Sequence, residues 1–377
     1  MTEVLKIKKY KSPGLKKGSS KWKNSNGQRY LEVYGTDYYT LGYLEGSELS
    51  KQIFTFKNRI GLINFKYLLK TFTYKKLIKI SRNYEPFIPQ IHIDEMHGIA
   101  DAILELEYED ILLQNCFLDI FYGFLLPKYS KNINLRQLEV GCTSLGAITP
   151  NGPITAQNFD FPMFLKHAAA FVHVKTPQKN EFFSLRMGAQ LSLPMGMNSN
   201  GLSIRVNVVK SKPTGLITLP NTVKSRIFLE RFDNIEKLSD FLKNYGSTSS
   251  GNLLISDNSN LIALEVVPKG FIREDVINTV VRSNTFISHL IQKYLINKNY
   301  SKKRQTYTEM LLREKFIEKN GYMTNSDFLA ILANDPIICR SNIFKPMTLA
   351  FLTEKYFGLG NPKKNTPGIV PIKKKRF

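Results

Sequence analysis

Apolar residues recur at helical spacing in the first third of the chain and in short strand-like runs afterwards. Between Tyr30 and Leu125 they fall mainly three or four positions apart, which predicts a mostly helical segment. After Cys142, β-branched and aromatic runs are bounded by Gly, Pro and Asn, which predicts strands. The predicted strands contain Ile148, Ile154 to Phe161, Ala170 to Val174, Phe182 to Leu185, Leu202 to Val209, Leu253 to Ile255 and Leu261 to Val267.

Helical patterns interrupt and follow these strands at Ser225 to Lys243, Phe286 to Ile296 and Thr306 to Leu332. Many strands flanked by helices favour an α+β layered domain over a doubly wound one. Residues 1–28 are polar and rich in lysine, glycine and serine, so we expect a flexible basic arm there.

A β-hairpin is predicted directly after Cys142. The turn signal Pro150-Asn151-Gly152 separates two strand-like runs, Thr143 to Thr149 and Pro153 to Phe159. Pairing symmetric about Asn151 places Cys142 opposite Asp160, with Cβ atoms about 4.5–5.5 Å apart. A shift of one residue would move one of the two side chains to the other face.

The net charge of +22 is concentrated at the two ends of the chain. Residues 1–24 carry +7 and residues 361–377 carry +6, which leaves +9 for the other 336 residues. This distribution favours solvated tails, with contact to nucleic acid or an anionic membrane as the alternative. Runs such as Cys116 to Leu126 are short and interrupted by Asp119, so we expect no membrane span and, without an apolar leader, no signal peptide.

The cysteines and histidines match no disulfide, metal or nucleotide motif. Three widely spaced cysteines predict a reducing, cytoplasmic setting, and Cys116 and Cys339 fit the ordinary role of small buried hydrophobes. In the segment IHIDEMH the two histidines are five residues apart, about 140° out of phase on a helix, so we expect no metal site. Gly358-Leu359-Gly360 lacks the third glycine of a dinucleotide loop, and we expect no cofactor.

A colinear set of short motifs carries a family resemblance over about residues 35–362. The set resembles the penicillin acyltransferase family of autoproteolytic N-terminal-nucleophile (Ntn) cysteine hydrolases. In chain order the motifs are Tyr43-Leu44-Glu45-Gly46, Glu95-Met96-His97-Gly98-Ile99-Ala100, Gly141-Cys142-Thr143-Ser144, Ala156-Gln157-Asn158-Phe159-Asp160, Gly196-Met197-Asn198-Ser199-Asn200-Gly201-Leu202, Ser249-Ser250-Gly251-Asn252 and Ser283-Asn284-Thr285-Phe286.

The resemblance implies a four-layer αββα sandwich and a precursor that cuts its own Gly141–Cys142 bond. It divides the chain into the arm 1–28, a mainly helical segment 29–141, an αββα catalytic core 142–362 and a basic tail 363–377. A new N-terminus at Cys142 would hold nucleophile and base on one residue, because a free α-amine has a pKa of about 7.7–8.0. No partner histidine is then needed.

The resemblance also implies roles for three further residues. Asp160 would orient the Cys142 amine and thiol, its alternative being a turn aspartate at a strand end. Asn284 would donate to the oxyanion, its alternative being a turn residue or an N-cap at the start of the helix predicted from Phe286. Arg340 resembles an arginine near the active site, its alternative being a surface residue. The family's usual His and Trp are replaced here by Thr285 and Phe159, which leaves the substrate pocket undefined.

These residues predict a cysteine amidohydrolase or acyltransferase that acts on a linear amide, an acyl-amine or an acyl-peptide through a Cys142 thioester. An acyl-CoA donor and a homo-oligomer of cleaved heterodimers are further candidate partners. The alternatives are a catalytically inactive Ntn-fold binding protein and a basic nucleic-acid-binding protein. Retention of Gly141, Cys142, Asp160 and Asn284 argues against the first, and the absence of aromatic–basic RNA motifs against the second.

Overall fold

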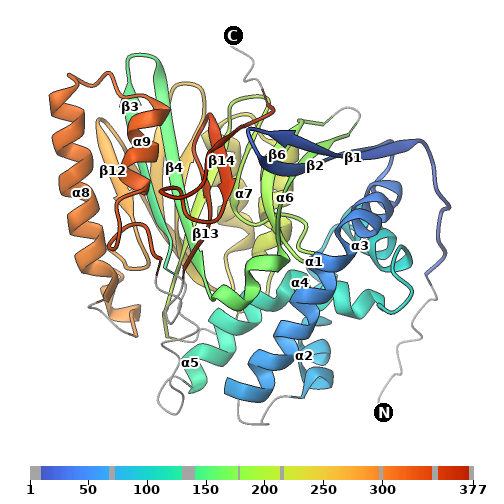
Figure 1. Ribbon diagram of the computed structural model, residues 1–377. Helices are drawn as coiled ribbons and strands as arrows, with labels where there is room; N and C mark the ends of the chain where they lie inside the picture. Colours follow the sequence, from blue (N-terminus) through green and yellow to red (C-terminus); the bar gives the residue numbers. More distant parts are fainter. Residues whose placement is uncertain are drawn as a thin grey trace.

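Two β-sheets pack face to face, and helices cover the outer face of each (Figure 1). The computed structural model describes residues 10–67, 73–129, 141–176, 179–212, 216–296, 300–341 and 347–372. The arrangement is a four-layer αββα sandwich, which confirms the predicted fold class.

The larger sheet has nine strands in the order β1-β2-β5-β6-β7-β8-β9-β10-β11. Its neighbouring strands are antiparallel except β2 and β5, which run parallel, so the first hairpin extends a sheet built by later residues. The strands are β1 (Gly18–Ser25), β2 (Gln28–Gly35), β5 (Ala169–Lys175), β6 (Phe182–Met187), β7 (Met195–Asn198), β8 (Ser203–Val209), β9 (Ser250–Ser256), β10 (Leu261–Val267) and β11 (Gly270–Asp275).

The smaller sheet is antiparallel, with six strands in the order β12-β3-β4-β13-β14-β15. Its strands β3 and β4 face β8 and β9 of the larger sheet. The strands are β3 (Thr143–Thr149), β4 (Gly152–Phe161), β12 (Thr279–Arg282), β13 (Met347–Leu352), β14 (Tyr356–Leu359) and β15 (Gly368–Ile369).

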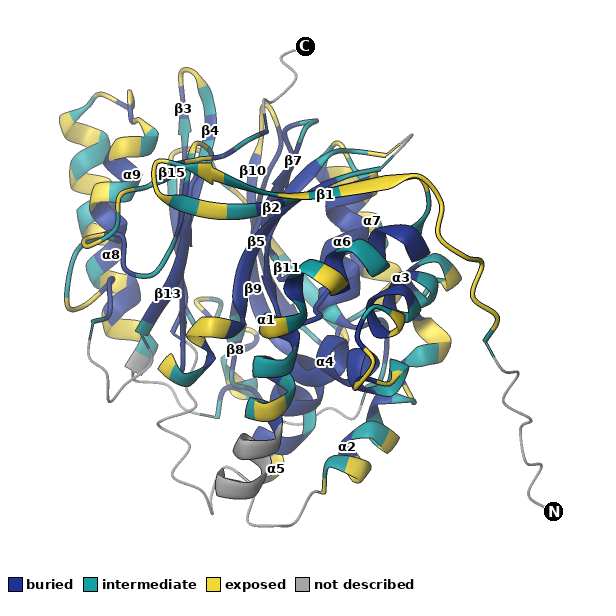
Figure 2. Ribbon diagram, turned by 45° about the vertical axis from the view of Figure 1, so that its right-hand side comes forward, coloured by how far each residue is buried: buried dark blue, intermediate teal, exposed yellow. Residues whose placement is uncertain are grey.

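The helices divide between the two outer layers. The helices α8 (Tyr300–Glu318) and α9 (Asn325–Leu332) cover the smaller sheet and enclose an apolar core that includes Leu145, Phe328 and Phe351. The others lie on the side of the larger sheet or, in the case of α2 and α5, below the sandwich in Figure 1: α1 (Tyr38–Tyr67), α2 (Tyr74–Ser81), α3 (Gln90–Asp101), α4 (Tyr108–Ile120), α5 (Leu126–Tyr129), α6 (Asn221–Arg231) and α7 (Ile235–Tyr245). Figure 2 shows the inner strands and much of α4 and α6 as buried.

One helical stretch is long and apolar enough to cross a membrane, which the sequence analysis did not expect. It runs from Tyr108 to Lys128 through α4, the π-helical turn Phe121–Leu125 and α5. Inside the structure 89% of its apolar window is buried. Its apolar side chains therefore already pack against the protein's own core.

Several predicted boundaries need correction. The arm is shorter than residues 1–28 because Gly18–Ser25 pairs with β2 as a strand. The tail from residue 363 is partly packed, since β15 pairs with β14 and Val370 and Ile372 are buried, while residues 373–377 lie outside the described residues. Phe286 to Ile296 is not a helix and contains only the 3₁₀ turn Gln292–Tyr294. The other two predicted helices, Ser225 to Lys243 and Thr306 to Leu332, each correspond to two helices in the structure. The side chains of Asn234 and Thr324 cap the N-termini of the second helices, α7 and α9.

A buried ionic cluster joins the helical segment to the core. His92 Nδ1 lies 3.4 Å from Glu95 Oε2, and His92 Nε2 lies 3.4 Å from Glu230 Oε1. Arg226 approaches both carboxylates, at 3.3 Å and 3.5 Å. His92 and Glu95 belong to α3, whereas Arg226 and Glu230 belong to α6. Because these groups have no exposed surface, each charge depends on its partners for stabilisation.

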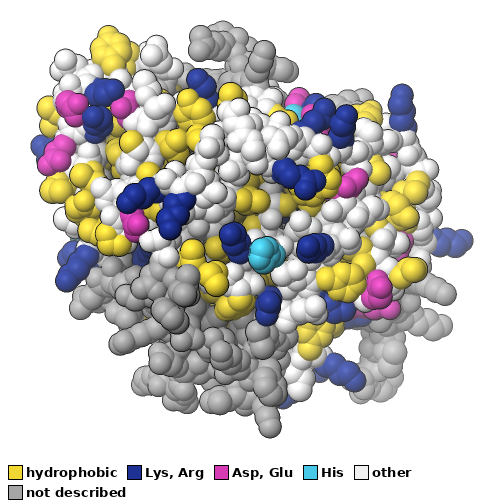
Figure 3. Space-filling view, in the orientation of Figure 1, with side chains coloured by type: hydrophobic (Ala, Val, Ile, Leu, Met, Phe, Trp, Pro, Cys, Tyr) yellow, Lys and Arg dark blue, Asp and Glu magenta, His cyan; other side chains and the backbone are white. Residues whose placement is uncertain are grey.

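Cationic side chains are spread over the face of the molecule that Figure 3 shows. They lie among acidic and apolar side chains there. Among the described residues of this face, the basic side chains do not form the continuous stripe that is typical of a nucleic-acid-binding surface.

Candidate active site

Cys142 lies directly before β3, at the end of the sandwich where β4 and β12 end and β13 begins. Only 1% of its surface is exposed. Its carbonyl oxygen accepts a hydrogen bond from Arg304 Nη2 at 3.2 Å. The residue before it, Gly141, donates its backbone N–H to the Asp160 carbonyl at 3.1 Å. The candidate nucleophile is thus tied to two other elements of the core.

The hairpin folds one residue out of the predicted register. Thr149 pairs with Gly152 and Thr143 with Asn158, so the turn has two residues and is not symmetric about Asn151. The Thr149 hydroxyl donates to the Gly152 carbonyl at 2.7 Å and accepts the Asn151 N–H at 3.2 Å, which stabilises the tighter turn. By extension of this register Asp160 lies opposite Gly141. The prediction that Asp160 lies directly opposite Cys142 is therefore wrong.

Asp160 nevertheless lies beside Cys142 and carries partners of its own. Its backbone amide lowers the pKa of the Cys142 thiol, against the larger effect of burial. Its side chain is fully buried, with Oδ1 accepting the Thr348 hydroxyl at 2.7 Å and Oδ2 lying 3.3 Å from Arg340 Nε. A strand-end turn aspartate would need none of these contacts, so the structure favours a role within the site.

Arg340 packs directly over Gly141. A Cβ atom added to Gly141 would lie 2.3 Å from Arg340 Nη1 and 2.7 Å from its Cζ, so a larger residue does not fit without displacing the guanidinium. The Arg340 backbone N–H donates to the Thr348 hydroxyl at 3.0 Å, and the Thr348 N–H donates to the Arg340 carbonyl at 3.1 Å. Arg340 is only 7% exposed, so it is not the surface arginine of the alternative.

Asn284 follows β12, and its side-chain amide is held from both ends. Its Oδ1 accepts a hydrogen bond from Arg304 Nη2 at 2.6 Å, and its Nδ2 donates to the Val208 carbonyl at 2.8 Å. Since a guanidinium can only donate, this contact fixes which end of the amide is oxygen. The second N–H of Nδ2 is left for another acceptor. Arg304 therefore connects Asn284 to Cys142, although no hydrogen bond in the described part of the chain joins the two directly.

The loop that carries Asn284 is held by two buried polar side chains. Asn252 Nδ2 donates to the carbonyls of Ser283 and Thr285, both at 2.7 Å. Further on, the Glu265 carboxylate accepts the backbone N–H groups of Ile287 and Ser288. Because no helix starts at Phe286, Asn284 is not an N-cap; it lies in a bend, as the turn alternative expects.

The site has one carboxylate and two guanidiniums around a buried thiol. Burial raises the pKa of Cys142 to about 12 and the Asp160 charge adds to the increase, whereas the Asp160 amide, Arg304 and Arg340 oppose it. Burial also raises the pKa of Asp160, against the opposing effect of Arg340, Arg304 and Thr348. At neutral pH the thiol of the uncut chain is therefore protonated. The net positive surroundings favour negative charge that develops on sulfur or on a tetrahedral oxygen.

Three of the described histidines serve other contacts, and His167 and His289 are exposed. His92 lies in the buried ionic cluster, and His97 stacks between Tyr10 and Tyr108, with ring centroids 3.6 and 4.1 Å away. His173 is paired with Glu181 at 2.5 Å. In the described part of the chain no hydrogen bond or ion pair joins a histidine to Cys142, and no group of three metal-binding side chains converges.

Two residues of the site escaped the sequence analysis as functional candidates. Arg304 stands in the run Ser301-Lys302-Lys303-Arg304, which looks like a solvated basic patch. A signal does exist, because Arg304, Thr308 and Leu312 are buried at i, i+4 and i+8 and so share the inner face of α8. Thr348 appears only as a neighbour of the Arg340 motif, and nothing in its spacing marks it.

A family model and a curated relative match part of this chain. The family model for acyl-coenzyme A:6-aminopenicillanic acid acyltransferase matches residues 148–334, a segment that contains Asp160, Asn284 and Arg304. The Emericella nidulans protein "Acyl-coenzyme A:6-aminopenicillanic-acid-acyltransferase 40 kDa form" is 24% identical over 258 residues, which cover 65% of this chain and 66% of the relative, just under two thirds of its length.

Among solved structures, the Caenorhabditis elegans ortholog of N-acylethanolamine-hydrolyzing acid amidase is similar, with 15% identity and a TM-score of 0.45 over 56% of this chain and 92% of that one. The family model, the curated relative and the colinear motifs agree on one assignment. The chain is therefore similar to the acyl-coenzyme A:6-aminopenicillanic acid acyltransferase family over residues 148–334.

Proposed function

We propose that the chain is a self-processing cysteine amidohydrolase or acyltransferase with Cys142 as its nucleophile. The observation that carries this proposal is the set of contacts around Cys142. Arg304 bonds both its carbonyl and Asn284, while Asp160 and Arg340 adjoin it on the Gly141 side. Nucleophile, orienting carboxylate and candidate oxyanion donor thus meet at one end of the sandwich.

The first proposed step is cleavage of the Gly141–Cys142 bond. Cys142 Sγ attacks the Gly141 carbonyl carbon, and the C–N bond breaks as the amine takes up a proton. Asp160 is the candidate proton acceptor, because its buried carboxyl has a raised pKa and lies next to the thiol. Water then hydrolyses the thioester, leaving a carboxylate on Gly141 and a free thiol and α-amine on Cys142.

In the mature enzyme the new α-amine takes the thiol proton. The thiolate attacks the carbonyl of a linear amide or acyl-amine, and the second N–H of Asn284 Nδ2 is the candidate donor to the oxyanion. The α-ammonium then protonates the leaving amine, and a thioester forms. Water or a second amine resolves it.

The choice between hydrolysis and transfer depends on the acceptor. The curated relative is named an acyl-CoA:6-aminopenicillanic acid acyltransferase, so an acyl-CoA donor and an amine acceptor are included among the candidate substrates. N-acyl amino acids, β-alanyl amines and acyl-peptides complete the panel. Each is assayed with and without added amine, and a product that carries the added amine identifies transfer.

Intact mass measurement tests the proposal directly. In proportion to their residue counts, cleavage after Gly141 divides the 43.2 kDa chain into fragments of about 16 and about 27 kDa. Cys142→Ala should remain uncut and inactive. The matched control is Cys116→Ala, a buried cysteine of α4, which should process normally. An active preparation that stays at 43.2 kDa after long incubation would show that the mechanism is wrong.

A further inference from the structure

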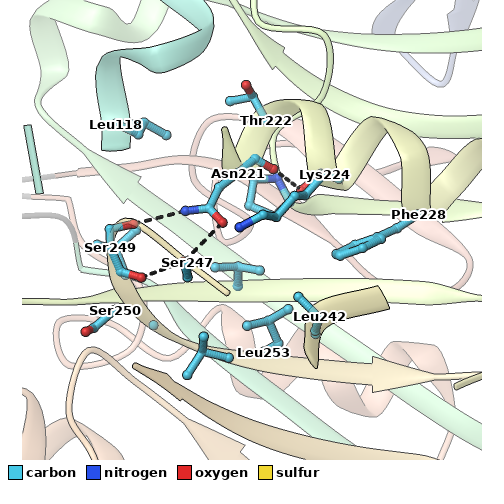
Figure 4. Close-up of a pocket in the computed structure, with 16 residues that line it drawn as sticks. Leu118, Asn221, Thr222, Lys224, Phe228, Leu242, Ser247, Ser249, Ser250 and Leu253 are labelled. Carbon is cyan, nitrogen blue, oxygen red and sulfur yellow. Dashed lines mark hydrogen bonds between the residues drawn. The ribbon is translucent and has the colours of Figure 1, made fainter. Parts of the chain in front are cut away.

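A cavity of about 50 Å³ lies behind the larger sheet, on the side of helices α6 and α7 (Figure 4). Most of its wall is apolar. The apolar lining residues are Leu118, Pro194, Val206, Val208, Phe228, Leu242, Leu253 and Val266. Its polar wall is formed by Asn221 and Lys224 of α6 and by serines of residues 247–250, toward which these two side chains extend.

Lys224 brings a buried positive charge to the cavity. Its residue surface is only 2% exposed, and its ammonium donates to the Gly246 carbonyl at 2.5 Å. In the described part of the chain, no carboxylate lies within 4.0 Å of this ammonium. A buried ammonium without a direct counter-ion is costly, so an anion that reaches it is stabilised.

The nearest acidic group, Asp119, is already engaged elsewhere. Its Oδ2 accepts the backbone N–H of Asn221 at 2.9 Å, at the start of α6, and its Oδ1 accepts Asn221 Nδ2 at 2.6 Å. The Ser249 hydroxyl adds a bond to the same Oδ1 at 3.4 Å. Burial lowers the pKa of Lys224 to about 8, with Asp119 only partly opposing the shift. The Asp119 carboxylate thus caps α6 and offsets only part of the cost of burying the Lys224 charge.

We propose that the cavity binds a short aliphatic monocarboxylate, with its carboxylate on the Lys224 ammonium and its chain against Val206, Val208 and Phe228. The size fits, because a water molecule needs about 10–15 Å³ of such space, so the cavity holds a carboxylate and two or three carbon atoms. Propionate has these dimensions. Pro194, Val206, Val208 and Asn221 keep part of their surface accessible, so a molecule of this size can reach the wall that they form.

The cavity adjoins the candidate active site through one residue. The Val208 side chain lines the cavity, while the Val208 carbonyl accepts the hydrogen bond from Asn284 Nδ2. A bound carboxylate therefore packs against the strand residue that orients the candidate oxyanion donor. The binding itself does not depend on the chemistry proposed for Cys142, because the Cys142→Ala chain keeps the same cavity.

The test is a titration of sodium propionate into the Cys142→Ala chain at constant ionic strength, followed by melting temperature and calorimetry. We expect a saturable rise in melting temperature, since a ligand that binds only the folded chain stabilises it. Lys224→Met should raise the propionate concentration at half-saturation about ten- to a hundredfold, which is the effect expected when a bond to a charged group is lost. Lys243→Met, an exposed lysine of α7, is the matched control and should leave it unchanged.

Two further experiments test the proposal even if Lys224→Met fails to fold. Propionamide, which has the same shape without the charge, should give no saturable shift. Val206→Leu, which fills part of the cavity and keeps the ammonium, should weaken propionate binding. The absence of a saturable propionate shift, an equal shift with propionamide, or unchanged half-saturation in the folded variants would each overturn the proposal.

Discussion

Replacing Arg304 by methionine should impair both self-cleavage and turnover. The guanidinium is 3% exposed and gives one nitrogen, Nη2, to two acceptors, the Cys142 carbonyl and Asn284 Oδ1. Methionine removes both bonds and leaves the Asn284 amide free to rotate about its remaining contact with Val208. Arg304 acts on the reaction through Asn284, so it is a positioning residue.

The magnitude follows from what the amide is expected to supply. Loss of one oxyanion donor lowers kcat by about 10²–10³, so Arg304→Met should approach but not exceed that range. The substrate KM should change little, because the interaction acts on the transition state. Arg304→Lys keeps the positive charge but lacks the planar guanidinium, so its kcat should lie between those of Arg304→Met and the unmodified chain. Since the Arg304 charge lowers the pKa of both Cys142 and Asp160, the methionine variant should also shift its acid limb to higher pH.

The assay combines a time course of intact mass with kcat and KM measured from pH 5 to 9. Arg313→Met on the exposed face of α8 is the matched control and should behave like the unmodified chain. A folded Arg304→Met variant that processes and turns over at the unmodified rate would refute the reasoning. So would equal losses in the lysine and methionine variants with an unchanged pH profile, because that result indicates a merely structural role.

Three further substitutions test other parts of the site and the fold. Gly141→Ala should slow self-cleavage in the mass time course, because its Cβ would displace Arg340 from Asp160, and an unchanged rate would contradict this packing. Asn284→Ala should lower kcat about 10²–10³ with KM nearly unchanged, and a normal rate would move the oxyanion donor to backbone amides near Cys142. Burial lowers the pKa of His92, but Glu230 and Glu95 outweigh it and the net pKa is raised; melting temperature should therefore fall as pH rises through that pKa, and His92→Gln should abolish the fall.

The strands after Cys142 could be predicted from the sequence because buried strands contain short runs of β-branched and aromatic residues. The helical pattern at Phe286 to Ile296 was misleading for a related reason. Phe286, Ile291 and Leu295 are buried together against Val209, so their apolar character reflects loop packing. The Glu265 carboxylate from β10 accepts hydrogen bonds from the backbone N–H groups of Ile287 and Ser288. This contact joins residues far apart in the sequence, so the local sequence pattern does not predict it.

The hairpin prediction was correct about the proximity of Cys142 and Asp160, although its register was wrong by one residue. The one-residue shift removed the direct opposition of Cys142 and Asp160, yet the two stayed neighbours because both lie at the open end of the same hairpin. What the hairpin could not supply was the charge around them. Arg304 lies on α8, 162 positions after Cys142, and Arg340 lies before β13, 198 positions after Cys142. No local sequence pattern predicts that residues so far apart meet.

These two arginines also explain why Asp160 can be buried beside a reacting thiol. A lone buried carboxylate would repel the thiolate and the oxyanion, since its charge raises the pKa of Cys142. Arg340 pairs with that carboxylate, and Arg304 adds a second positive charge that lowers the pKa of both Asp160 and Cys142. One guanidinium thus pairs with the aspartate, while the other lies against the Cys142 carbonyl and Asn284. The C-terminal third of the chain therefore completes the electrostatics around the proposed nucleophile, Cys142, which lies directly before β3.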